Sequence, residues 1–147
     1  METNLKFNSA ICTSREQSER LLALGLKKET ADMVWSGLSE NPICHPYKRI
    51  KRLASDLNDK VHPAWSLHRL IEMMPKRIKN VKEDWDMCSH DIAFVITEDL
   101  DVNYEEPFED EPCYNKYFHE GNLYDKIVNS IAWLIKEGYF NKEYLEG

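Results

Sequence analysis

The sequence predicts an α+β fold with N-terminal helices, a small antiparallel sheet of three to four strands, and a long C-terminal helix packed on that sheet. Two observations predict this class. Apolar residues recur at helical spacing over residues 123–135, which is typical of a helix with one buried face. Residues 92–96 and 100–104 are rich in β-branched and aromatic side chains, which favours strands. At 147 residues, the chain is predicted to form a single domain, 1–147.

The first helix is predicted from Ser14 and Gln17, which have the spacing of a capping box. Gly25 is its predicted end, because glycine adopts positive φ without steric cost. Residues 30–35 are interpreted as a second, short helix, although so short an apolar run does not separate a helix from the start of a strand. Residues 36–46 are rich in glycine, asparagine and proline and predict a loop.

An amphipathic helix is predicted over residues 47–57, where apolar residues recur at helical spacing. Its outward side chains are basic: Lys48, Arg49, Lys51 and Arg52. A break around Pro63 follows. Ser66 is then well placed to cap a further helix, and Pro75 ends that helix because proline cannot donate the next helical hydrogen bond.

The second half of the chain predicts the sheet and its covering helix. Residues 97–99 suit a hairpin turn between the two main strands, and residues 77–81 and 113–118 are weaker strand predictions on either side. The last helix is predicted to begin after Asn122, a good cap, and to end at Gly138.

Charge is sorted along the chain. Residues 43–82 carry a net charge of +7, and residues 83–120 carry −12. This asymmetry predicts two surfaces of opposite sign. The overall charge of −7 with 42% hydrophobic residues is ordinary for a soluble protein. No apolar run approaches the ~20 residues of a membrane span, and the first residues lack a signal-peptide pattern, so a cytoplasmic protein without membrane contact is expected.

Metal binding and catalysis are not predicted. The cysteines lack the paired spacing of a zinc site, and only Cys88 and His90 come near it. The chain has no GxSxG motif and no glycine-rich phosphate loop. Its clustered carboxylates are typical of a solvated surface. The sequence therefore predicts no cofactor, no metal and no enzymatic activity.

Three stretches of the chain look familiar together. They are EQSERLLALGL at 16–26 followed by TADM at 30–33, PAWSL at 63–67, and AWLIKEGY at 132–139. In this order and spacing they resemble a family of small uncharacterised bacterial proteins found on prophages and conjugative elements of gut anaerobes. The resemblance implies a cytoplasmic accessory protein of a mobile element and carries over no functional residue. The chain is more basic over 43–60 than the family's usual pattern.

The function predicted first is that of an accessory protein that binds a protein partner of unknown identity. The alternative is a weak nucleic-acid binder that uses the basic face of 47–57, with an affinity limited by the acidic stretch next to it. A small enzyme without a recognisable motif is third. An acidic partner surface that imitates phosphates is predicted from Glu105, Glu106, Glu109, Asp110 and Glu111. The oligomeric state is left open.

Overall fold

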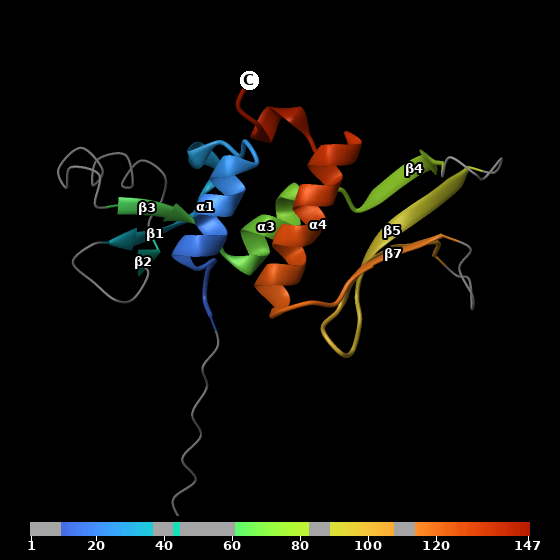
Figure 1. Cartoon of the computed structure of the whole chain (residues 1–147), viewed down its shortest axis with the longest axis horizontal. Helices are drawn as coiled ribbons and strands as arrows, with labels where there is room; N and C mark the ends of the chain where they lie inside the picture. Colours follow the sequence, from blue (N-terminus) through green and yellow to red (C-terminus); the bar gives the residue numbers. More distant parts are fainter. Residues whose placement is uncertain (1–9, 37–42, 45–60, 83–88, 108–113) are drawn as a thin grey trace, which may run out of the picture.

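The computed structural model describes residues 10–36, 43–44, 61–82, 89–107 and 114–147. These residues form an α+β fold, as the sequence predicts, with helices between two antiparallel sheets (Figure 1). The helical elements are α1 (Arg15–Ala23), α3 (Leu67–Met73), α4 (Leu123–Glu137) and the 3-10 turns η1 (Lys28–Thr30) and η2 (Lys142–Tyr144).

The strands in the described ranges belong to two separate sheets. The smaller sheet has the order β2-β1-β3, with β1 (Met33–Ser36), β2 (Ile43–Cys44) and β3 (Val61–Ala64). The larger sheet has the order β4-β5-β6-β7, with β4 (Arg77–Val81), β5 (His90–Ile96), β6 (Val102–Glu105) and β7 (Asn115–Phe118). In Figure 1, α1 lies beside the smaller sheet and α4 beside the larger one.

Helix α1 begins with the predicted capping box. The backbone N–H of Gln17 donates to Ser14 Oγ at 3.1 Å, and the N–H of Ser14 donates to Gln17 Oε1 at 2.9 Å. The helix turns its fully buried Leu21 toward the core, and Gly25 follows it with φ of +101°. The predicted start and stop of this helix are therefore confirmed.

The predicted helix over residues 30–35 is wrong. Thr30 ends η1, and Met33–Ser36 forms β1, in which Val34 pairs with Pro63 and Trp35 with His62 of β3. Where the structure has β3, the sequence predicts only a break around Pro63, because proline cannot donate a hydrogen bond to a strand ladder. Pro63 is tolerated here because β3 is an edge strand. Strand β2 was not predicted either, since it lies within the predicted loop at 36–46.

Helix α3 has the predicted cap at Ser66, whose Oγ accepts the backbone N–H of Arg69 at 3.2 Å. The carboxylate of Asp32 holds this cap in turn, since it accepts the Ser66 backbone N–H at 2.8 Å and the Ser66 hydroxyl at 2.5 Å. The smaller sheet is thereby tied to the start of α3.

The larger sheet contains the two predicted main strands and both weaker ones, and α4 packs across it. Asn122 caps α4 and Gly138 ends it with φ of +79°, as predicted. Helix α4 contributes fully buried side chains to the core, and the ring centroid of its Trp133 lies 5.7 Å from that of Tyr104 on β6. One core cluster joins α1, α3, α4 and the larger sheet. The single-domain organisation stays a prediction.

Lys126 of α4 holds the turn between β5 and β6. Its buried ammonium group lies 2.9 Å from Asp101 Oδ1 and donates to the carbonyl of Leu100 at 3.0 Å, where Leu100 has φ of +61°. We expect Lys126→Met to lower the free energy of unfolding by about 1–2 kcal/mol, because the turn loses a charged hydrogen bond. Urea unfolding measures this. The exposed Lys136→Met is the control, and equal midpoints for the two variants would contradict the role of Lys126.

Candidate functional site

Most of the predicted partner-binding residues lie outside the described part of the chain. These are the basic Lys48, Arg49, Lys51 and Arg52, and the acidic Glu109, Asp110 and Glu111. The two predicted surfaces therefore stay predictions. Only Glu105 and Glu106 of the acidic set can be placed.

Glu106 points its carboxylate at His90 rather than at solvent. Glu106 Oε1 lies 2.6 Å from His90 Nδ1 and accepts the backbone N–H of Tyr114 at 2.9 Å. The side chain of Glu106 is only 19% exposed. Glu105 is half-buried and lies 3.5 Å from Asn103 Nδ2. Glu106 therefore links β5 to the start of β7.

Two basic residues that follow the predicted basic helix have structural partners. Arg69 Nε donates to the carbonyl of Thr30 at 2.7 Å. Lys76 Nζ donates to the carbonyls of Ile71 and Met74 at the end of α3, and its partial burial lowers the pKa of its ammonium group. Both side chains are therefore held in place by carbonyls of the protein itself.

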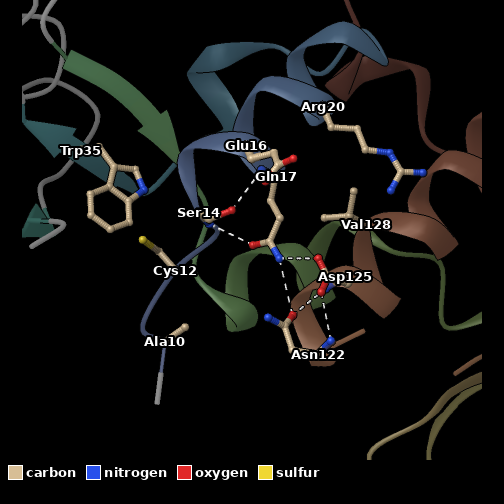
Figure 2. Close-up of a pocket in the computed structure, with 10 residues that line it drawn as sticks. All are labelled: Ala10, Cys12, Ser14, Glu16, Gln17, Arg20, Trp35, Asn122, Asp125 and Val128. Carbon is tan, nitrogen blue, oxygen red and sulfur yellow. Dashed lines mark hydrogen bonds between the residues drawn. The ribbon is translucent and has the colours of Figure 1, made fainter. Parts of the chain in front are cut away.

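A cleft of about 770 Å³ opens between the first turns of α1 and α4 and the side chain of Trp35 on β1 (Figure 2). We call it the cleft. Its volume falls in the usual range of ligand-binding sites, about 300–1,000 Å³. Three elements from distant parts of the sequence meet here, so the cleft is a product of the tertiary fold.

The floor of the cleft consists of two capping boxes joined by one side chain. Asn122 and Asp125 cap α4 reciprocally, with N–H to oxygen distances of 3.0 and 2.9 Å. Gln17 of the α1 capping box then donates its Nε2 to Asp125 Oδ1 at 2.6 Å and lies 3.5 Å from Asn122 Oδ1. Because both helix starts are capped by their own side chains, the cleft is not an anion site of the kind that uncapped helix N-termini provide.

The walls of the cleft are apolar and its rim carries charges of both signs. Cys12 and Trp35 form one side, and the Trp35 indole N–H donates to the carbonyl of Thr13 at 2.8 Å, which fixes the ring. Exposed Glu16 and Arg20 lie on α1 at the rim. The cleft therefore offers the amide nitrogen of Asn122, the aromatic ring of Trp35 and one charge of each sign.

The chain that enters the cleft is anchored at Ala10. The Tyr124 hydroxyl donates to the Ala10 carbonyl at 3.1 Å. Burial raises the pKa of the Tyr124 hydroxyl, so it keeps its proton and remains a donor at neutral pH. This contact holds the segment before α1 against α4.

In the part of the chain that the structure describes, no group of three or more His, Cys, Asp or Glu side chains is arranged to hold a metal ion. No helix there has the length and apolar character needed to cross a membrane.

Sequence reasoning missed the cleft. It identified Ser14, Gln17 and Asn122 only as helix caps, and nothing in their local pattern indicates that the two caps touch across more than 100 residues of chain. Comparison with family models, curated proteins and solved structures gives no match for this chain. The resemblance to a mobile-element family therefore stays a prediction.

Proposed function

We propose that the chain is a non-enzymatic interaction protein that binds a protein partner through the cleft, as a cytoplasmic accessory protein of a mobile element. The observation that carries this proposal is the joined pair of capping boxes beneath a cavity of about 770 Å³. Three features of the cleft support the proposal. They are the rigidity of its floor, its mixture of polar and apolar groups, and the hydrogen bonds that its polar side chains already make.

Rigidity favours binding. The side chains of Gln17, Asn122 and Asp125 are held by each other and by the first turns of two helices. A site already fixed before its partner arrives loses little conformational entropy on association. Recognition groups placed on helices are also held more closely than groups on loops.

Mixed polarity favours a protein segment as the ligand. A peptide presents both N–H donors and carbonyl acceptors along its backbone, together with apolar side chains. The cleft presents the amide nitrogen of Asn122, which the caps do not use, an aromatic face from Trp35, and opposite charges at its rim. Aromatic residues and arginine are the side chains enriched in protein interfaces.

The use of its polar groups supports binding over catalysis. A general acid or base must be free to exchange a proton with its substrate. In the cleft, the Asp125 carboxylate accepts hydrogen bonds from Gln17 and from the Asn122 backbone, and both bonds stabilise helix starts. Removing them for a reaction would break one half of the α4 capping box and its link to Gln17.

Two exposed glutamates on α1 provide a matched test. Glu16 lies at the rim of the cleft and Glu19 does not line it. We expect Glu16→Lys to weaken capture of the partner from native-cell extract at least about tenfold, because it places a like charge near Arg20 and against partner groups suited to a carboxylate. Glu19→Lys should bind as the parent does. Quantitative affinity capture followed by mass spectrometry measures both variants.

The outcome that contradicts the proposal is equal recovery of the same partner by both variants. Circular dichroism and thermal melting check that the variants fold, and both substitutions are at exposed positions. A partner recovered by Glu19→Lys but lost with Glu16→Lys identifies the cleft as the contact surface.

A further inference from the structure

A second pocket lies at the opposite end of α4 from the cleft. Its volume is about 300 Å³, at the lower end of the range for ligand sites. It opens between the end of β4, the strand β7 and the last turn of α4. We call it the lysine pocket because three lysines line it together with aromatic rings: Lys82, Lys116, Lys136, Tyr114, Trp133 and Tyr139.

The lysine pocket concentrates positive charge in an acidic protein. Across the described residues, none of its three ammonium groups forms an ion pair with a carboxylate. Among the described lining residues, Glu137 is the one acidic side chain. Lysines that line one pocket without carboxylate partners suit an anion, and phosphate is bound by lysine as a point charge.

The pocket also has an aromatic wall. Trp133 is half-buried and fixed by its neighbours, with ring centroids 5.7 Å from Tyr104 and 5.6 Å from Tyr139. Aromatic side chains held in this way serve as platforms on which a nucleobase stacks. A single ligand that carries both a phosphate and an aromatic ring would therefore use both features of the pocket.

The net charge of the chain separates a small ligand from a polymer. The chain carries a net charge of −7. A nucleic acid presents a phosphate at every nucleotide, and a protein of net negative charge repels such a polymer more strongly than it repels a single phosphate group. One phosphate group can be neutralised by the three lysines. From these observations we propose that the lysine pocket binds a nucleoside monophosphate.

The test is a titration of the ¹⁵N-labelled full chain with AMP, UMP, inorganic phosphate and a single-stranded oligonucleotide. The indole N–H resonance of Trp133, assigned with Trp133→Phe, reports on the pocket. We expect saturable shifts with AMP or UMP below about 1 mM, and phosphate alone should bind at least about tenfold more weakly because it cannot stack. Lys116→Gln should raise the Kd at least about fivefold. The exposed Lys28→Gln, far from the pocket in sequence and on η1, should leave it unchanged.

Four results would overturn the proposal. They are no saturable shift with either nucleotide at about 5 mM, phosphate binding as tightly as AMP, an oligonucleotide binding more tightly than the mononucleotides, or equal losses in Lys116→Gln and Lys28→Gln. Thermal melting of each variant confirms that these surface changes leave the fold intact. Partner capture through the cleft is measured separately, so this site and the proposed function succeed or fail independently.

Discussion

Ile131→Asp is expected to lower the free energy of unfolding by about 4 kcal/mol or more, a large part of what holds a domain of this size together. Ile131 is fully buried in the middle of α4, in the core cluster that α4 shares with α1, α3 and the larger sheet. An aspartate there would force an unpaired carboxylate into apolar packing, where it has no water to solvate it.

The control for this variant is its neighbour. Ala132 is half-buried on the same helix, so Ala132→Asp introduces the same charge where water still reaches it. We expect it to cost about 1 kcal/mol, in line with a partly exposed substitution. Thermal and urea unfolding measure both proteins. An Ile131→Asp protein that melts within a degree of the parent would contradict the burial of this face of α4 in the core.

Trp65→Ala is expected to cost about 3–5 kcal/mol, the usual range for removing a large aromatic side chain from a core. Trp65 is fully buried and joins three segments. Its indole N–H donates to Thr30 Oγ1 at 2.9 Å, and its backbone exchanges hydrogen bonds with Thr13, at 3.1 Å to Oγ1 and 2.9 Å from the Thr13 N–H.

Trp65→Phe separates packing from hydrogen bonding. Phenylalanine keeps an aromatic ring but lacks the indole donor, and Thr30 Oγ1 retains its own bond to the carbonyl of Lys27 at 2.6 Å. We therefore expect Trp65→Phe to cost less than half as much as Trp65→Ala in urea unfolding. Equal losses in the two variants would show that the hydrogen bond, not the packed volume, is what Trp65 contributes.

The elements that were predicted correctly are those whose signals are local. A cap and a stop lie within one turn of each helix, so Ser14, Ser66, Asn122 and Gly138 could be identified from neighbouring residues alone. The strands of the larger sheet follow one another in sequence, and only residues 97–101 separate β5 from β6, which is the arrangement that pattern analysis detects best.

The smaller sheet was not predicted because its paired strands are distant from each other in sequence. Strand β1 pairs with β3 about 30 residues later, and its four residues are too few to show a period of two. Pro63 also argued against a strand at the position of β3, although an edge strand tolerates proline. Where strand pairing is non-local, the local pattern does not show it.

Both candidate sites were missed for the same reason. The cleft depends on Gln17 meeting Asp125, and the lysine pocket gathers Lys82, Lys116 and Lys136 from three separate elements. Lys116 is the one basic residue in the acidic stretch 83–120, where the local charge points to the opposite kind of surface. The net charge of a stretch of sequence therefore did not predict the charge of the pocket that its side chains line.

Hydrogen exchange of the full chain, with and without its captured partner, tests the central claim most directly. If the partner binds in the cleft, amide protection should increase in residues 10–20, 33–36 and 122–128 and stay unchanged in β4 and β7. Protection that appears only in the larger sheet or only around residues 48–52, with residues 10–20 exchanging as in the free protein, would contradict the cleft as the binding surface.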